Sequence, residues 1–153
     1  MNYWIILLVI LIDQISKIIV QNHFSLGESI PVIPNIFHLT YVQNVGAAFG
    51  ILKYQRNFFI FITMAIIIGI LIFTLIRSKL HPIVLYSFAF IIGGAIGNLL
   101  DRIRFGYVID FFDFRIWPVF NIADISIVAG TALLAYYLIF LDKEENAKSR
   151  NDS

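Results

Sequence analysis

The stretch VIDFFDF holds two carboxylates, Asp110 and Asp113, among large apolar side chains. Five of the chain's seven aspartates lie on or beside the ends of apolar segments, so aspartate is the reactive residue type concentrated here. Two carboxylates held close together share one proton near neutral pH, because both cannot ionise cheaply. The ionised member can take a proton from water while the protonated member donates one, which permits peptide hydrolysis without a metal. The five are Asp13, Asp101, Asp110, Asp113 and Asp124.

A catalytic pair of this kind must lack a fixed cation, because a cation would hold both carboxylates ionised. Three of the five aspartates have a lysine or arginine within four residues, whereas Asp110 and Asp124 have none. We therefore predict that Asp110 and Asp124 form the catalytic pair. The aspartates with a neighbouring cation are Asp13 with Lys17, Asp101 with Arg102 and Arg104, and Asp113 with Arg115.

Other polar residues allow both a structural and a functional interpretation. Asp13 and Lys17 are four residues apart on one helical face, so they can form an ion pair whose role is purely structural. Asn121 can cap a helix or contact a substrate, and the sequence leaves both open. The GxxxG spacing of Gly93 and Gly97 lets a second helix approach closely. Polar residues follow these glycines on the same helix, namely Asn98, Asp101 and Arg102. Helix packing alone does not require polar residues there, which favours a functional site.

Four segments that could cross a membrane must position these residues. A span takes about 20 mostly apolar residues. Of the 153 residues 59% are hydrophobic and 14% charged, against about 45–50% and 25% in soluble domains. The first segment lacks the basic start and the small-residue cleavage site of a signal peptide, so we expect it to be retained. The predicted spans are residues 3–20, 58–76, 82–100 and 122–141.

The two longer connections, residues 21–57 and 101–121, should lie on the outer side of the membrane. Pro31 and Pro34 exclude a helix in the first connection, and the β-branched and aromatic residues after them predict a strand from Ile36 to Val42. Irregular backbone exposed to lipid would leave polar groups unpaired, so a small sheet above the bilayer is expected. The predicted fold is a single α-helical polytopic membrane domain with four transmembrane helices, a small extracytoplasmic β-sheet and a short interfacial helix near residues 50–59.

Four spans bring both termini to one side, which we predict to be cytoplasmic. The short connection between the second and third spans carries Arg77 and Lys79, as the positive-inside rule expects of a cytoplasmic loop. The charged tail, residues 142–153, falls on the same side. The opposite side carries more cations in total, so the count of cations does not fix the orientation.

The composition excludes several other chemistries. The chain has no cysteine, so disulfides, thiolate metal sites and thiol nucleophiles are ruled out. The three histidines show no metal-ligand spacing and no serine stands out with a base, so neither a metal nor another cofactor is expected. The net charge of +1 gives no reason to expect a nucleic acid partner.

Five sequence blocks, in order along four predicted spans, make the chain resemble lipoprotein signal peptidase, the bacterial signal peptidase II family. One block alone would be weak, but the five together are specific and extend over nearly the whole length. They are DQISK (13–17), NVGAAFG (44–50), GGAIGNLLDR (93–102), VIDFFD (108–113) and FNIAD (120–124).

The resemblance implies an aspartyl endopeptidase that cleaves prolipoproteins just before a diacylglyceryl-modified cysteine, with Asp110 and Asp124 as its catalytic pair. It implies a monomer in the bacterial cytoplasmic (inner) membrane, with the active site near the outer face. The expected partners are lipidated prolipoproteins, membrane lipids and cyclic lipopeptide inhibitors such as globomycin. Asp101 and Asp113 are expected to support the site. The residues implied to line the substrate site are Asp13, Lys17, Asn44, Gly46, Asn98, Arg102 and Asn121.

Two other functions are compatible with buried aspartates. A transporter or proton relay uses such residues, but it should have acids at successive depths, and the second predicted span has none. A structural subunit of a membrane complex would explain the glycine face but not so many carboxylates.

Overall fold

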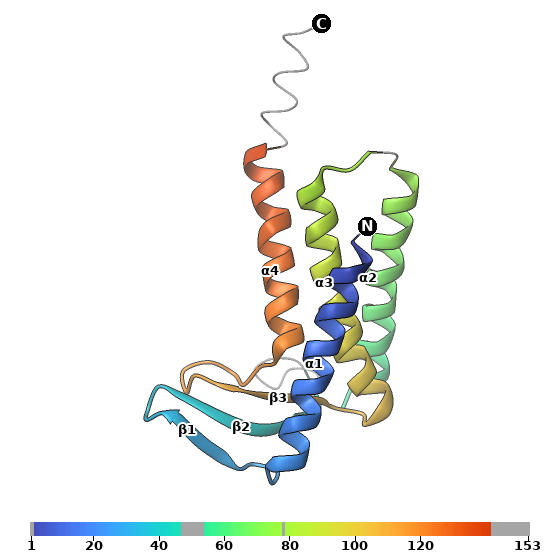
Figure 1. The fold of residues 1–153 in the computed structure, drawn as a ribbon. Helices are drawn as coiled ribbons and strands as arrows, with labels where there is room; N and C mark the ends of the chain where they lie inside the picture. The colour runs from blue at the N-terminus through green and yellow to red at the C-terminus, as the bar shows by residue number, and fades with distance from the viewer. Residues whose placement is uncertain (1, 47–53, 78, 142–153) are drawn as a thin grey trace, which may run out of the picture.

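Four long helices and a three-stranded sheet make up the part of the chain that the computed structural model describes, residues 2–46, 54–77 and 79–141 (Figure 1). Each helix is long and apolar enough to cross a membrane, α4 together with the π-helical turn that follows it. The predicted fold class is confirmed. The elements are α1 (Tyr3–His23), β1 (Ser29–Ile33), β2 (Phe37–Asn44), α2 (Arg56–Ile76), α3 (Pro82–Arg104), β3 (Val108–Asp113), α4 (Ile122–Tyr136) and η2 (Tyr137–Leu141).

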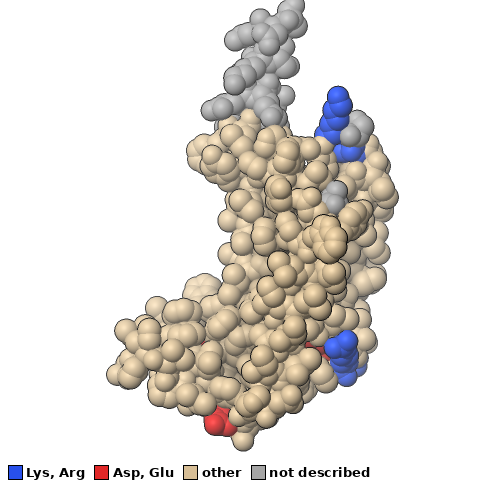
Figure 2. All heavy atoms as spheres, in the orientation of Figure 1, with Lys and Arg blue, Asp and Glu red and all other residues tan. Residues whose placement is uncertain are grey.

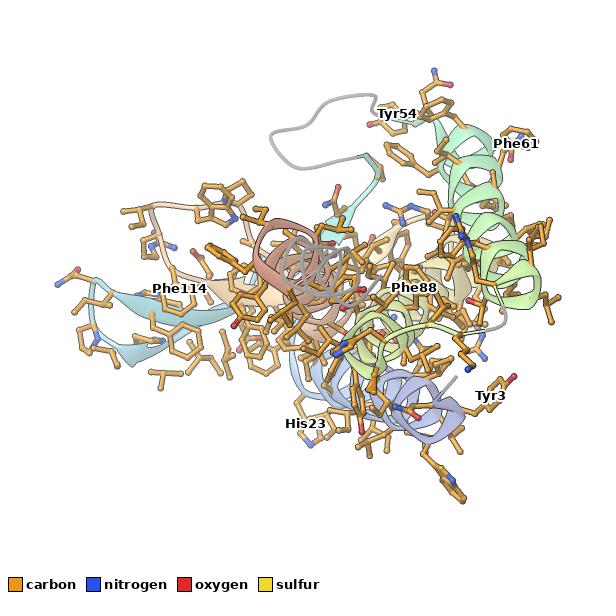
Figure 3. All side chains as sticks on the ribbon, turned by 90° about the horizontal axis from the view of Figure 1, so that it is seen from above. Tyr3, His23, Tyr54, Phe61, Phe88 and Phe114 are labelled. Carbon is orange, nitrogen blue, oxygen red and sulfur yellow. The ribbon has the colours of Figure 1, made fainter. Side chains whose placement is uncertain are left out.

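Helix α3 is the centre of the bundle. In its most apolar stretch 61% of the residues are buried, against 6% in α2. Figure 3 looks along the bundle and shows Phe88 of α3 among the helices, whereas Phe61 of α2 points outwards and is 73% exposed. An apolar helix with so little buried surface is suited to lipid as its surroundings.

Glycines on α3 let two other helices reach its backbone. A Cβ added to Gly93 would lie 2.9 Å from the Cβ of Val9 in α1, and one added to Gly94 would meet the carbonyl oxygen of Ala123 in α4. A Cβ on Gly97 would also meet α1 and α4. The close approach predicted from the GxxxG spacing is confirmed.

The sheet lies at one end of the bundle, where α1 ends and α4 begins, and the opposite end holds the start of α1 and the end of α4 (Figure 1). Its strands are antiparallel in the order β1-β2-β3. The strand predicted over 36–42 is β2, displaced by one or two residues. Strand β1 was not predicted, and Pro31 lies within it. Because β1 is an edge strand, the missing N–H of Pro31 can face away from the ladder.

Two helices extend beyond the predicted spans. Helix α3 continues to Arg104, because residues 101–104 keep the helical hydrogen bonds. Helix α1 likewise continues to His23. The interfacial helix expected near 50–59 falls partly outside the described residues, and from Arg56 onwards this stretch belongs to α2. The tail, 142–153, also lies outside them.

A β-bulge interrupts the pairing of β2 with β3, and the additional residue lies in β2. Leu39 and Val42, three apart on β2, pair with Phe112 and Asp110, which are two apart on β3. Strand β3 therefore keeps its regular alternation through VIDFFD. Asp110 and Asp113, three apart on it, face opposite sides of the sheet.

Candidate active site

Both predicted catalytic residues line a pocket of about 240 Å³ between the sheet and the adjoining ends of α3 and α4. Asp110 projects from β3, and Asp124 lies in the first turn of α4. Strand β3 and the start of α4 thus supply one carboxylate each. The pocket is lined by Asn44, Gly46, Asn98, Arg102, Val108, Asp110, Trp117, Pro118, Val119, Phe120 and Asp124.

Asn121 connects the two carboxylates. Its backbone N–H donates to Asp124 Oδ2 at 3.2 Å, and its side-chain Oδ1 accepts from the backbone N–H of Asp124 at 2.9 Å, which completes a capping box. Its side-chain amide donates to Asp110 Oδ1 at 2.7 Å. Asn121 is fully buried. The capping role predicted for Asn121 is confirmed, and the same side chain also holds Asp110.

Two further asparagines hold the remaining carboxylate oxygens. Asn44 Nδ2 donates to Asp110 Oδ2 at 2.9 Å, and Asn98 Nδ2 donates to Asp124 Oδ1 at 2.8 Å. The backbone N–H of Gly46 donates to Asn44 Oδ1 at 3.0 Å, which fixes the orientation of that amide. Every oxygen of the two carboxylates therefore accepts one amide hydrogen bond, and each keeps a lone pair for another proton.

Asp110 has the perturbed acidity that general acid–base catalysis needs. Burial, followed by the negative charge of Asp124, raises the pKa of Asp110 to about 7, against the hydrogen bonds from Asn44 and Asn121, which favour the ionised form. The side chain lies outside the spanning helices and is 2% exposed. Asp110 therefore exchanges its proton near neutral pH.

Lys17 is the centre of a buried network adjacent to the pocket, which we call the Lys17 network. Its Nζ lies 2.9 Å from Asp13 Oδ2 and 2.8 Å from Asp101 Oδ2, and it donates to Asn98 Oδ1 at 3.0 Å. All three ammonium N–H donors are thus used. The ion pair predicted for Asp13 and Lys17 is present, but its second carboxylate, Asp101, is 84 positions away in the chain.

The Lys17 network ties four elements together and fixes a side chain of the pocket. Asp13 Oδ1 accepts from the backbone N–H of Ala123 at the start of α4, and Asp101 Oδ2 accepts from the backbone N–H of Ile109 in β3. Asn98 Oδ1 accepts from Lys17, so its NH2 group must point to Asp124. Asp13, Lys17 and Asp101 are not in the pocket lining and reach it through Asn98.

Asp113 belongs to a separate cluster, on the face of the sheet opposite to that of Asp110. Its Oδ2 lies 2.9 Å from Arg115 Nη1 and accepts from Thr40 Oγ1 at 2.8 Å. Although burial acts in the opposite direction, the hydrogen bonds from Arg115 and Thr40 hold the pKa of Asp113 below its ordinary value. Asp113 is thus kept ionised, as its neighbouring arginine predicted.

The predicted absence of a cation beside Asp110 and Asp124 agrees with the ion pairs in the structure, but one arginine does line their pocket. Within the described residues neither Asp110 nor Asp124 has an ion pair within 4 Å. Asp101 was set aside because of its neighbours Arg102 and Arg104, yet its partner is Lys17. Arg102 instead lines the pocket with its guanidinium carbon 4.8 Å from the ring centroid of Phe59. A cation absent from the local sequence of the acids therefore lies near them in space.

Part of the pocket wall was not predicted from the sequence. The connection from β3 to α4 contributes Trp117, Pro118, Val119 and Phe120, and β3 contributes Val108. The run WPVF contains two aromatic residues and a proline in an otherwise short connection, which is the signal that could have indicated it. Trp117 and Phe120 also line a neighbouring apolar groove of about 440 Å³ along α4, with Asp124, Ile125, Val128 and Ala129.

Sequence comparison shows which known proteins are similar to this chain. A family profile described as "Signal peptidase (SPase) II" matches residues 5–140. A lipoprotein signal peptidase from Halothermothrix orenii is 55% identical over 138 residues, which are 90% of this chain and 94% of the relative. A lipoprotein signal peptidase from Clostridioides difficile strain 630 is 48% identical over 143 residues, 92% of this chain and 95% of the relative.

Two solved structures have the same fold. One, described as a bacterial membrane enzyme solved by the in meso method at 2.3 Å resolution, is 33% identical with a TM-score of 0.84, covering 94% of this chain and 88% of the other. A second, at 1.9 Å resolution, is 34% identical with a TM-score of 0.82, covering 90% and 92%. With the profile extending over most of its length and relatives this similar, the chain belongs to the signal peptidase II family.

Proposed function

We propose that this protein is a membrane aspartyl endopeptidase that removes signal peptides from lipid-modified prolipoproteins, cleaving before the diacylglyceryl cysteine. Family membership supports the removal of lipoprotein signal peptides. The aspartic mechanism rests on one observation: Asp110 and Asp124 share a pocket at the end of the bundle and are bridged by Asn121.

The chemistry assigns one role to each acid. Asp110 carries the shared proton, because its pKa is raised to about 7. Ionised Asp124 takes a proton from water as the water oxygen attacks the scissile carbonyl carbon, and Asp110 donates its proton to the carbonyl oxygen. The tetrahedral intermediate then breaks the C–N bond as Asp124 gives its proton to the leaving amine, and one hydroxyl of the intermediate returns a proton to Asp110. A carboxylic acid and an amine are released, and one water is consumed.

The pocket's surroundings suit a lipidated peptide. The apolar groove along α4 shares Trp117, Phe120 and Asp124 with the pocket, so a chain lying in it would begin beside the catalytic acid. We assign the groove to the substrate's lipid. Asn44, Gly46, Asn98 and Arg102 line the pocket and are the proposed contacts for the peptide.

The remaining predicted residues act indirectly, through the side chains that they hold in place. Asp13, Lys17 and Asp101 fix the orientation of Asn98, and Asn121 aligns the two acids. We also propose that cyclic lipopeptides such as globomycin bind in the pocket with a hydroxyl between the carboxylates. The enzyme is proposed to act as a monomer in the cytoplasmic membrane of a bacterium, with both termini cytoplasmic and the sheet outside.

A proton relay through the membrane finds no support in the distribution of acids. All acidic residues in the described ranges, namely Asp13, Glu28, Asp101, Asp110, Asp113 and Asp124, belong to the half of the bundle nearer the sheet or to the sheet itself. Helix α2 has none. A relay would need carboxylates at successive depths.

The test is cleavage of a precursor peptide with a diacylglyceryl-modified cysteine by the purified full-length protein. Asp110→Asn and Asp124→Asn should each lose at least about 100-fold in turnover, the scale of general acid–base catalysis. Mass spectrometry of the products gives the cleavage position, and the same peptide with an unmodified cysteine should remain intact.

Asp113→Asn is the matched control, because it is the same substitution on the same strand but at an ion-paired residue outside the pocket lining. It should keep most of the turnover. Near-normal turnover by Asp110→Asn would end the assignment, provided that all three variants insert and elute as the parent protein does.

A further inference from the structure

A second cavity lies at the end of the bundle opposite the sheet, between α2, α3 and α4. Its volume is about 510 Å³, twice that of the catalytic pocket. Phe73 of α2, Phe88 of α3 and Leu134 of α4 line it from three sides, and the rings of Phe73 and Phe88 meet edge to face at 5.9 Å. The walls are thus apolar and continue the lipid-facing surface of the helices.

The mouth of this cavity is cationic. Arg77 and Lys79, from the connection between α2 and α3, line it and are exposed. The guanidinium carbon of Arg77 lies 5.7 Å from the ring centroid of Phe73, so the cation is held beside the apolar wall. Helix α3 begins at the same mouth, and its N-terminus adds a partial positive charge. These features all favour an anion at the mouth.

Within the described residues, no acid lies at this end of the bundle. The six described acids belong to the sheet half, as noted above. Figure 2 shows blue side chains over the α2–α3 connection, and red atoms appear only towards the sheet. The charge of Arg77 and Lys79 is therefore not neutralised by a described carboxylate.

We propose that this cavity binds an anionic diacyl phospholipid, with its phosphate at Arg77 and Lys79 and an acyl chain against Phe73, Phe88 and Leu134. A cationic mouth over apolar walls at the end of spanning helices matches a lipid headgroup joined to its chain. The turn after α4, η2, forms part of the wall through Tyr137 and Leu138, and π-helical turns frequently occur at functional sites.

The bound lipid has a structural consequence for α2. Only Ile67 is buried on α2, so this helix is held weakly by protein contacts. A lipid wedged between Phe73 of α2 and Leu134 of α4 supplies contacts that these helices lack. Binding should therefore raise the thermal stability of the whole protein.

The test is native mass spectrometry of the full-length protein in detergent, with dioleoylphosphatidylglycerol or dioleoylphosphatidylcholine added at equal concentration. The phosphatidylglycerol should stay bound to a larger fraction of the protein and raise its Tm. Arg77→Gln with Lys79→Gln should lower its affinity by roughly fivefold for each cation removed, to the level of the phosphatidylcholine. Leu134→Trp, which fills the cavity, should weaken binding of both lipids.

The charge-matched control is Lys148→Gln with Arg150→Gln, which removes two cations from the tail of the chain and should leave the preference unchanged. All variants should keep the parent's peptidase turnover, which shows that they fold. Equal binding of the two lipids, or an equal loss in the control, would overturn the proposal. So would phosphatidylglycerol binding that appears only after Glu144→Gln with Glu145→Gln, because the acidic tail would then be the occupant.

Discussion

At the scale of single residues, the two acids proposed as catalytic, Asp110 and Asp124, differ in their surroundings although both are aspartates. The oxygens of Asp110 accept from two side-chain amides, whereas Asp124 accepts from Asn98 and from the backbone at the start of α4. Burial and the neighbouring charge raise the pKa of Asp110 to about 7. Asp110 is therefore protonated below that pH and can act as the acid.

This acidity predicts the pH dependence of turnover. Because the protonated form of Asp110 is required, kcat/KM should fall as the pH rises through about 7. Asn44→Ala removes a hydrogen bond that favours the ionised form, so the alkaline decline should move to higher pH. Kinetics with the lipidated peptide from pH 5 to 9 measure this.

Gln43→Ala is the control for Asn44→Ala. It removes the neighbouring side-chain amide, which faces the other side of the sheet and contacts Tyr41 and Tyr107. Its alkaline decline should stay where it is in the parent protein. A decline that moves to lower pH in Asn44→Ala would contradict the role given to Asp110.

At the scale of elements, the start of α4 combines helix capping with site geometry, and substitution at Asn121 can separate them. Serine caps a helix but lacks the amide that donates to Asp110. Asn121→Ser and Asn121→Ala should lose similar amounts of turnover, whereas the alanine variant should be less stable by about 1 kcal/mol. Thermal unfolding and peptide cleavage on the same samples measure both. Full activity of the serine variant would refute the amide's role.

The packing of α1 and α4 on α3 depends on the missing side chain of Gly97. A Cβ there would lie 2.5 Å from Asp13 Oδ2 and 3.3 Å from the Cβ of Ala123. Gly97→Ala should destabilise the protein by about 1–3 kcal/mol, as overpacked cores do, and should displace the Lys17 network. Thermal unfolding followed by light scattering gives the comparison.

Gly69→Ala is the matched control, because a Cβ at Gly69 in α2 has no described atom within 4 Å. Alanine favours a helix over glycine, so Gly69→Ala should be neutral or slightly stabilising. Equal destabilisation by the two variants would mean that the close approach at Gly97 does not matter.

The elements were predictable to the extent that local sequence determines them. Uncharged runs indicated the four long helices, and the absence of a nearby cation selected Asp110 and Asp124, which do line one pocket. The partner of Lys17 at Asp101 was not predictable, because it depends on how α1 packs on α3. The bulge in β2 was not predictable either, since a period-two pattern gives no signal for an additional residue. The missing information was which residues far apart in the sequence pair with each other in space.

At the scale of the whole molecule, the structure separates two ends with different chemistry. The sheet end holds the described acids and the pocket proposed as the active site, and the opposite end holds the cationic cavity. Arg77 and Lys79 favour a cytoplasmic position for the second end under the positive-inside rule. Among the cations at the sheet end, Lys17 and Arg115 are ion-paired, whereas Arg56, Arg102 and Arg104 make no ion pair with any described residue, so the orientation has to be measured.

The orientation can be measured directly, because the chain has no cysteine. Ile36→Cys in the turn between β1 and β2, which is 58% exposed, should react with a membrane-impermeant maleimide added to intact cells. Asn2→Cys at the start of α1 should react only after the cells are opened. The reverse pattern would place the catalytic pocket in the cytoplasm and contradict the proposed orientation.

The bulge in β2 limits how this site could be rebuilt elsewhere. A designer who paired VIDFFD with a regular strand that kept His38 opposite Asp113 would place Tyr41, and not Val42, opposite Asp110. Asn44 would then turn to the other face of the new sheet and could no longer donate to Asp110. The geometry of the site therefore depends on two strands, and the motif shows only one of them.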